Sequence, residues 1–251
     1  MDLSDYRASE AERDRTADLL RLLPRSAENA LDIGARDGHF SVLMADRIAQ
    51  VTALDLTLPD IADPRVHCVA GNAAALPFSD RQFDVVFCAE VLEHIPEPTL
   101  QMACKEISRV SAKHVLIGVP NEQDIRVGRC TCQSCGKSSP PWGHVNSFDS
   151  QRLRNLFPEF EVESESYVGE RREATNGLST LLMDLGGNPY GTYGQEEPCI
   201  HCGQPLKAPV ARSVVQRAST KLAFVVRRAT ERFAKPRGNW VHILFRRRAD
   251  T

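Results

Sequence analysis

A short cysteine pattern that occurs twice offers the most specific chemistry in this 251-residue sequence. The pattern C-x-x-C-G places Cys132 near Cys135 and, after 63 intervening residues, Cys199 near Cys202. Two thiolates at this spacing hold one side of a tetrahedral metal ion, and the glycine permits the tight turn around them. The two copies together predict a zinc site with four cysteine ligands.

Other roles for these thiols and their neighbours stay open at the level of sequence. A C-x-x-C pair also occurs in redox centres, and isolated cysteines are often free thiols. Cys130, His144 or His201 could replace one of the four zinc ligands. The duplication of the pattern favours zinc over redox chemistry.

A second group of residues has the pattern of a nucleotide-type cofactor site. Asp32 lies in a short apolar run that ends in Gly34, and Gly38 precedes a helical pattern. Glycines at a strand-to-helix turn let the backbone approach a ligand, and the helix N-terminus presents free N–H groups. Asp55 ends the next apolar run, 23 positions after Asp32, where an acid accepts hydrogen bonds from ribose hydroxyls. A glycine turn alone also fits a plain tight turn, but this combination predicts cofactor binding.

The elements that must position these residues alternate regularly over the first half of the chain. Apolar runs predict buried strands, and helical spacing predicts helices between them. The expected strands are 30–34, 51–55, 66–69, 83–89 and 114–119, and the expected helices are 8–23, 38–48 and 98–110. Such alternation implies right-handed crossovers and a parallel sheet covered on both faces.

After residue 120 the alternation stops. A short helix at 149–157 and strands at 160–168 and 239–245 follow, and these two strands could pair as a hairpin at a sheet edge. We therefore predict an α/β fold. It is a Rossmann-like, mostly parallel seven-stranded sheet with helices on both faces, an antiparallel final strand and zinc-knuckle insertions.

Motifs after the third and fourth strands carry a family resemblance. Gly71-Asn72-Ala73 and Leu76-Pro77-Phe78 follow the third strand, and Glu90-Val-Leu-Glu93-His94 follows the fourth. In this order, residues 28–120 resemble the class I S-adenosylmethionine-dependent methyltransferases, in particular the type 11 group. The resemblance implies S-adenosyl-L-methionine as the cofactor. It further implies Asp32, Gly34 and Gly38 at the methionine end, Asp55 at the ribose, Asn72 and Ala73 at the adenine, and Glu90 beyond the fourth strand.

Two positions depart from the family pattern. Asn72 stands where the family often has aspartate, and it still offers a donor and an acceptor to an adenine edge. Arg36 stands where the family usually has a glycine, so its Cβ must be accommodated close to the cofactor. Arg36 is also the only support for the alternative of a non-catalytic cofactor-binding scaffold.

The segment after the fifth strand is expected beside the cofactor and carries candidate acceptor residues. Trp142, His144 and Asn146 offer a flat apolar face, a titratable group and an amide. We predict His144 as the catalytic residue, a general base toward a hydroxyl acceptor, with a zinc ligand or a structural histidine as alternatives. Tyr190 and Tyr193, in a glycine-rich loop, could also reach the substrate.

Charge is distributed unevenly although the net charge is only −2. The segment from Lys207 to Arg248 contains 12 basic residues and one acid, whereas residues 1–206 contain 19 basic and 31 acidic residues. Within this segment, 209–234 has the pattern of an amphipathic helix. The helix either packs its apolar face on the protein's own sheet or contacts an anionic membrane. Nucleic acid is a weaker candidate partner, because stacking aromatics are sparse among the arginines.

The sequence also gives expectations for the location of the protein, for its reaction and for its division into seven segments. No run of 18 apolar residues and no signal-peptide pattern occurs, so we expect a cytoplasmic protein, with peripheral contact at the inner membrane face as an option. The expected function is O-methylation of a small molecule, a sugar, or a glycan or lipid head group, with RNA or protein methylation as the alternative. The segments are an N-terminal helix (1–27), the S-adenosylmethionine-binding core (28–120), a first Cys-containing insertion (121–148), a core helix and strand (149–169), a second Cys-containing insertion (170–208), a basic amphipathic helix (209–238), and a last core strand and tail (239–251).

Overall fold

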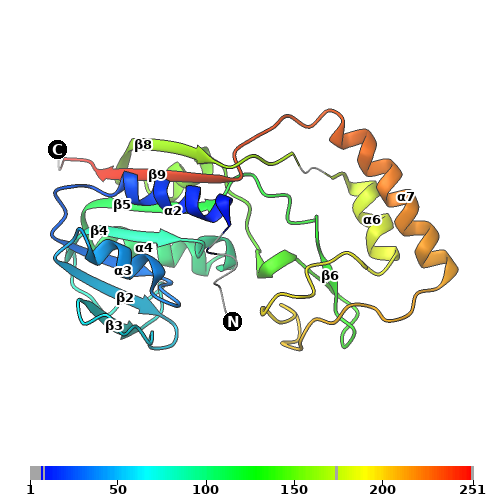
Figure 1. The fold of residues 1–251 in the computed structure, drawn as a ribbon, viewed down its shortest axis with the longest axis horizontal. Coiled ribbons are helices and arrows are strands. Elements are labelled where there is room, and N and C mark those ends of the chain that lie inside the picture. Colours follow the sequence, from blue (N-terminus) through cyan, green and yellow to red (C-terminus); the bar gives the residue numbers. More distant parts are fainter. Residues whose placement is uncertain (1–6, 8, 173–174, 250–251) are drawn as a thin grey trace. The chain divides into compact units, whose positions relative to one another are not determined.

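The computed structural model describes residue 7 and residues 9–172 and 175–249, and the chain divides into two compact units (Figure 1). The first unit comprises Met1–Asn121, Phe148–Gly169 and Gly238–Thr251, and the second comprises Glu122–Ser147 and Glu170–Arg237. Both cysteine patterns and the basic helix lie in the second unit. Across the described ranges, no helix is both long enough and apolar enough to cross a bilayer.

A seven-stranded sheet forms the centre of the first unit. Its strands are β1 (Asn29–Ile33), β2 (Gln50–Asp55), β3 (Val66–Ala70), β4 (Phe83–Ala89), β5 (Ser111–Pro120), β8 (Phe160–Val168) and β9 (Trp240–Arg247). The order is β3-β2-β1-β4-β5-β9-β8. The first five of these are parallel, and β9 runs antiparallel to both of its neighbours. This arrangement confirms the predicted fold class, including the antiparallel final strand.

Helices cover both faces of this sheet (Figure 1). They are α2 (Glu10–Leu22), α3 (His39–Ala45), α4 (Thr99–Val110) and α5 (Ser150–Leu156), and a short 3₁₀ helix, η1 (Leu92–His94), follows β4. Successive strand side chains point to opposite sides. On β4, Val85 therefore joins a buried cluster with residues of α2 and α3, whereas Val86 joins one with residues of α4 and α5. The helices predicted at 8–23 and 149–157 are present but slightly shorter.

Local sequence explains where two of these helices begin and end. The hydroxyl of Ser9 accepts a hydrogen bond from the amide of Glu12 and caps α2. The carboxylate of Asp149 caps α5 in the same way through the amide of Arg152. Pro24 follows the end of α2, because a proline cannot continue a helix.

The second unit contains a pair of helices and a cysteine-rich segment. Its elements are β6 (Cys130–Thr131), β7 (Ser138–Ser139), the 3₁₀ helix η2 (Pro141–Gly143), α6 (Gly177–Leu185) and α7 (Val214–Glu231). The sequence analysis expected irregular chain over 170–208 and so missed α6, which Asn176 caps. The helix predicted within 209–238 is confined to the shorter α7.

The helices α6 and α7 pack side by side and antiparallel (Figure 1). Near the start of α6, the Asn176 side-chain amide donates to Thr230 Oγ1 at 2.6 Å. Past its end, Gly186 leaves room for Thr220, because a Cβ at Gly186 would lie 2.3 Å from the Thr220 Oγ1. Small and polar side chains of α7 therefore form its contact with α6.

The points at which the chain leaves and re-enters the first unit lie together. Asn121, directly after β5, forms a bridge with Phe148, and its amide donates to the carbonyl of Asn239 at 2.9 Å. The amide of Asn239 in turn donates to the carbonyl of Val168 at 2.8 Å. Both excursions of the chain into the second unit thus begin and end at neighbouring residues.

Candidate cofactor site and candidate zinc site

The carboxyl ends of parallel strands meet at one edge of the sheet in the first unit. β1 lies between β2 and β4, and the register places Ile33 beside both Leu54 and Cys88. Strands β2 and β3 lie on one side of β1, and β4 and β5 lie on the other. The direction in which successive strands are added across the sheet therefore reverses at β1. In open α/β sheets, ligands bind in the crevice at such a point. The predicted cofactor residues follow these strand ends.

The two predicted glycines are required by backbone conformation and by close packing. Gly34 and Gly38 both have φ of 77°, a left-handed conformation that favours glycine. A Cβ at Gly34 would lie 2.3 Å from Cγ2 of Val91, and a Cβ at Gly38 would lie 2.5 Å from Ile61. Gly38 also occupies the N-cap position of α3. The turn after β1 is therefore shaped as the motif predicts.

Arg36 occupies its place in the turn without a glycine. Its φ is 49°, so it adopts the left-handed conformation that a glycine would provide, and its side chain is exposed. The Arg36 amide donates to Oδ2 of Asp55 at 2.9 Å. Arg36 is thus accommodated in the turn although the family usually has a glycine there. The hydrogen bond of its amide links the turn after β1 to the end of β2.

Asp55 is held in place by backbone amides. Its Oδ1 accepts a hydrogen bond from the amide of Leu56 at 2.6 Å, in addition to the bond from Arg36. An ionised carboxylate has about four lone-pair positions, so acceptor capacity remains after these two bonds. Asp55 can therefore accept hydrogen bonds from two neighbouring hydroxyl groups without moving.

Asp32 is the buried acid of the site. Its side chain is 3% exposed and accepts a hydrogen bond at 2.5 Å from the hydroxyl of Ser41, on α3. Burial raises the pKa of Asp32 to about 7, although the bond from Ser41 acts in the opposite direction. A cationic ligand nearby would favour the ionised carboxylate.

An ion pair that the sequence analysis did not single out lies beside Glu90. Arg15 and Glu12, both on α2 and both buried, are joined by two hydrogen bonds of 2.7 and 2.8 Å. Arg15 Nη1 also lies 3.7 Å from Oε1 of Glu90, whose φ is 57°. The only sequence signal for this pair is a charge spacing of three residues, which is typical of exposed helices as well.

Glu93 is a second buried carboxyl group in this region. Burial, and then the nearby charge of Glu90, raise the pKa of Glu93 well above its usual range. Within the described part of the chain, neither of its carboxylate oxygens has a hydrogen-bond partner.

Asn72 and Ala73 follow the end of β3. The amide of Gly71 donates to the carbonyl of Asp55 at 2.8 Å and ties this loop to β2. The Oδ1 of the exposed Asn72 accepts a hydrogen bond from the amide of Ala74 at 2.9 Å, whereas Ala73 is buried. The side-chain NH₂ of Asn72 is therefore the group that can donate to a ligand.

The candidate acceptor residues all belong to the second unit. His144 and Gln123 are buried, and His144 Nδ1 lies 2.6 Å from Gln123 Oε1. Because an amide oxygen only accepts, Nδ1 carries the proton and Nε2 is the basic nitrogen. The Trp142 ring lies 6.1 Å from the His144 ring, and Asn146 is buried. Trp142 itself is 45% exposed.

The two predicted tyrosines have structural contacts in the same unit. The hydroxyl of Tyr193 accepts a hydrogen bond from the amide of Thr131 at 2.9 Å, next to the cysteine-rich segment. The ring of Tyr190 contacts Phe224 of α7 at a centroid distance of 5.3 Å and is 65% exposed. Tyr190 is thus the more accessible of the two.

The four cysteines of the repeated pattern converge. All four Sγ atoms lie within 4.8 Å of one another, and the distances from Cys132 to Cys202 and from Cys135 to Cys199 are both 3.7 Å. A tetrahedral zinc ion with Zn–S bonds of about 2.3 Å separates its sulfurs by roughly 3.8 Å. The donor type, number and spacing therefore fit a structural zinc ion.

The two knuckles have the same backbone geometry. In each, the amide of the glycine donates to the carbonyl of the first cysteine at 2.9 Å, and the glycines have φ of 71° at Gly136 and 70° at Gly203. Burial opposes ionisation of Cys199, but hydrogen bonds from the Ser139 hydroxyl and from backbone amides lower the pKa of Cys199 to about 6. The environment of Cys199 therefore favours its thiolate. At Cys202 a backbone hydrogen bond acts in the same direction, but the contacts with the other three cysteines raise the pKa of Cys202 to about 12.

The other candidate zinc ligands have different contacts. Cys130 is buried with its Sγ 3.8 Å from Oγ1 of Thr192, and burial raises the pKa of Cys130. His201 Nε2 lies 3.1 Å from the carbonyl oxygen of Ser138. Neither joins the cluster of four sulfurs.

The strand order and the helices on both faces define a Rossmann-like domain. Residues 31–117 match a family model described as a methyltransferase domain. This match confirms, over that segment, the predicted resemblance to S-adenosylmethionine-dependent methyltransferases.

Curated proteins of similar sequence carry methyltransferase names. The chain is 34% identical over 97 residues to the ubiquinone biosynthesis O-methyltransferase of Idiomarina loihiensis, covering 34% of this chain and 40% of the relative. It is 36% identical over 106 residues to the demethylmenaquinone methyltransferase of Roseiflexus castenholzii, covering 39% and 44%. The chain thus spans about two fifths of the length of these relatives.

Among solved structures, the N-methyltransferase NodS of Bradyrhizobium japonicum, in complex with S-adenosyl-L-homocysteine, shares the fold. It superposes with a TM-score of 0.55 and 14% identity, over 98% of this chain and 91% of NodS.

Proposed function

We propose that this protein is an S-adenosylmethionine-dependent methyltransferase that acts on a small-molecule acceptor. The observation that carries the proposal is that the predicted cofactor residues follow the ends of the parallel strands, where the strand order reverses. These residues lie within the segment that matches a methyltransferase domain. The names of relatives in ubiquinone biosynthesis favour oxygen as the methylated atom. Arg36, with its exposed side chain, gives no reason to prefer a non-catalytic scaffold.

The cofactor would supply a methyl group on a sulfonium, and the residues of the first unit would bind and orient it. Gly34 and Gly38 allow close approach of the backbone at the methionine end, and Asp32 provides the negative charge there. Asp55 has the acceptor capacity for the two ribose hydroxyls. The adenine would lie against Asn72 and Ala73, and Glu90 would line the site beyond β4.

His144 is proposed as the base that accepts the proton of a hydroxyl acceptor. Its support is the bond to Gln123, which leaves Nε2 as the basic nitrogen. Trp142 and Asn146, in the same segment, would orient the acceptor. Methyl transfer is an in-line displacement, so positioning of donor and acceptor contributes much of the rate.

We further propose that Cys132, Cys135, Cys199 and Cys202 bind one structural zinc ion per chain. Such an ion would join the segment after β5 to the segment before α7 and would hold the second unit together. Elemental analysis of purified protein should give about one zinc per chain. Cys199→Ser should lose the metal, whereas Cys68→Ser, a half-buried cysteine of β3, should retain it. A full metal content in Cys199→Ser would overturn this site.

An anionic membrane surface is the proposed partner of the α6–α7 pair. On α6, Leu178, Leu181 and Leu185 form one stripe, and each is more than half exposed. On α7 the buried side chains are Thr220 and Ala223, while apolar ones are exposed: Val214, Val215, Leu222 and Val225. α7 therefore packs through its small and polar side, which is the reverse of a typical surface helix.

Exposed basic residues border the apolar stripe of α7. At about 100° per residue, Arg217, Lys221 and Arg228 lie on one flank of this stripe, and all three are exposed. An apolar helical face with cationic flanks fits the boundary between acyl chains and anionic head groups. This charge pattern favours a membrane over an uncharged protein partner.

A methyl-transfer screen tests the proposed function. Protein is incubated with methyl-labelled S-adenosylmethionine and separate pools of small molecules, glycans, lipids and RNA. We expect label in a non-macromolecular pool, loss of transfer in Asp55→Ala, and full transfer in the control Asp14→Ala, an exposed residue of α2. Label only in the RNA pool would contradict the acceptor class. Failure to bind S-adenosylhomocysteine would contradict the enzyme class.

A further inference from the structure

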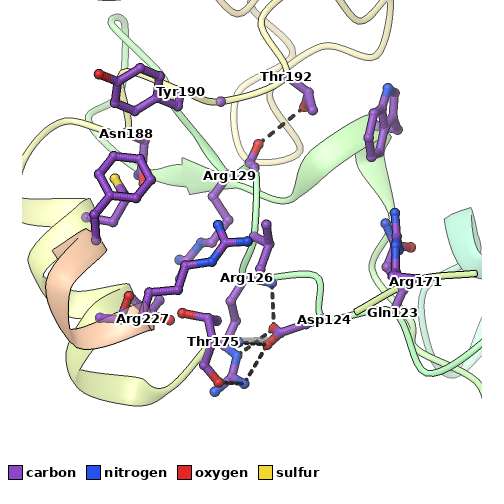
Figure 2. Close-up of a pocket in the computed structure, with 18 residues that line it drawn as sticks. Gln123, Asp124, Arg126, Arg129, Arg171, Thr175, Asn188, Tyr190, Thr192 and Arg227 are labelled. Carbon is purple, nitrogen blue, oxygen red and sulfur yellow. Dashed lines mark hydrogen bonds and ion pairs between the residues drawn. The ribbon is translucent and has the colours of Figure 1, made fainter. Parts of the chain in front are cut away.

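A cavity of about 310 Å³ lies within the second unit (Figure 2). Its walls come from the segment 123–129, α6, the loop 188–192 and α7. Among the lining residues, Gln123, Trp142 and Tyr190 are already connected with the candidate acceptor residues, and the others have no role in the proposed methyl transfer. The cavity is therefore a candidate site that the proposed methyl transfer does not explain.

Arginine side chains dominate the charge of this cavity. Arg126, Arg129, Arg171 and Arg227 line it, whereas Asp124 is the one acid among the lining residues that the structure describes. They come from three separate parts of the chain, so the fold brings them together. Figure 2 shows Arg129 and Arg227 extending into the cavity.

The acid of the cavity is neutralised by its neighbours. Asp124 accepts hydrogen bonds from Arg126 at 2.7 and 2.8 Å and from the amide of Thr175 at 3.1 Å (Figure 2). Burial opposes ionisation, but these bonds hold the pKa of Asp124 below its ordinary value. Asp124 and Arg126 thus form a structural pair, which leaves the N–H donors of the other arginines as the groups that can contact a ligand.

Arg129 and Arg227 keep donors for a ligand. Arg227 uses its Nε for Glu231, at 2.6 Å, and Arg129 places one Nη 3.3 Å from Asp184. Their side chains are only 26% and 19% exposed, so they are already partly desolvated and ordered. A guanidinium has five N–H donors in a planar fork that matches phosphate oxygens, so most donors of both residues remain.

Aromatic and apolar side chains form another part of the wall. Trp142, Tyr190, Phe224 and Met183 line the cavity together with the arginines. The rings of Tyr190 and Phe224 are in contact at 5.3 Å. A ligand that joins a strongly anionic group to a ring or sugar would satisfy both kinds of surface.

We propose that this cavity binds a phosphate ester, with Arg129 and Arg227 as the residues that contact the phosphoryl oxygens. The esterified group lies against Trp142 and Tyr190. This inference adds a ligand site in the second unit that shares Trp142 with the proposed acceptor residues, and its test does not need the methyl-transfer reaction.

Calorimetric titration with inorganic pyrophosphate tests the site without any activity assay. Arg227→Gln should weaken binding by about 10- to 150-fold, the range for losing hydrogen bonds to a charged group. Arg232→Gln is the matched control, because Arg232 directly follows α7, is exposed and does not line the cavity. Its affinity should stay within about twofold of the parent protein. Circular dichroism checks that both variants fold.

Two results would overturn the proposal: no binding of pyrophosphate by the parent protein, or equal losses in Arg227→Gln and Arg232→Gln. Titration with glucose 1-phosphate and with monomeric short-chain phosphatidic acid then distinguishes the two sources of a phosphate ester. Tighter binding of the sugar phosphate identifies a soluble ester, and tighter binding of the lipid identifies a head group.

Discussion

Replacing Asp32 by asparagine should remove the contribution that this buried carboxyl group makes to the pH dependence of the stability of the first unit. In the cofactor-free fold the pKa of the buried Asp32 is about 7, whereas an unfolded aspartate has a pKa of about 3.9. The folded unit therefore binds this proton more tightly than the unfolded chain does. The resulting stabilisation is fully present below about pH 4 and is lost as the pH rises through 7.

The difference in pKa determines the size of the effect. One pKa unit corresponds to about 1.36 kcal/mol, so the parent protein should lose roughly 2–3 kcal/mol of unfolding free energy between about pH 5 and pH 8. In Asp32→Asn the amide is neutral throughout, and its oxygen can still accept the hydrogen bond from Ser41. The variant should therefore lack this loss, while its binding of S-adenosylhomocysteine is damaged.

The two tryptophans of the chain allow a unit-specific assay. Trp240 lies in the first unit and Trp142 in the second, so a Trp142→Phe background leaves a fluorophore that reports only on the first unit. Urea unfolding is followed over this pH range for the background protein, for Asp32→Asn and for the control Asp14→Asn. If Asp32→Asn loses as much free energy as the background protein, Asp32 is not protonated in the fold and the reasoning fails.

Three further variants address the remaining proposals. Asp55→Ala should weaken S-adenosylhomocysteine binding by about 10- to 150-fold in calorimetry, because it removes charge-assisted bonds to the ribose; an unchanged affinity would reject the ribose site. His144→Ala should lower turnover by ~10²–10⁴ with little change in cofactor affinity; a variant that keeps its rate but loses metal would make His144 a zinc ligand instead. Replacing both Leu181 and Leu185 by glutamate should reduce flotation with anionic vesicles, whereas Met102→Glu, at an exposed position on α4, should not. The binding should also weaken as salt rises; no flotation of the parent protein at low or physiological salt would refute the membrane contact.

Contiguous motifs made much of the first unit predictable. Asp32, Gly34 and Gly38 lie within one strand–turn–helix segment, so their spacing carries the geometry of the turn directly. The two cysteine knuckles were predictable for a similar reason, since each is local in the sequence, and the structure adds that their four Sγ atoms converge. The alternation of strands and helices then left few arrangements for the sheet.

Features that depend on contacts between distant segments were not predictable in this way. The burial of Glu12 and Arg15 results from how α2 packs in the first unit, and an amphipathic pattern gives no sign of it. The helix α6 was missed because its short apolar segment is surrounded by glycines and asparagine, which suggested a loop. The arginine cavity is lined by four arginines that come from three parts of the chain. No spacing in the sequence indicates that these arginines line the same cavity in the fold.

The position of β9 has a consequence for how the protein folds during synthesis. His114 of β5 pairs with Arg246 of β9, so the sheet is completed only after the whole second unit has been made. Closing a long loop costs entropy and slows folding, and a metal ion that joins Cys135 to Cys199 would shorten that loop before β9 arrives. The supply of zinc would then determine how long the edge of β5 remains unpaired. An unpaired edge can pair with a strand of another chain. Metal-starved cells would accumulate aggregated or proteolysed protein rather than a stable, metal-free form.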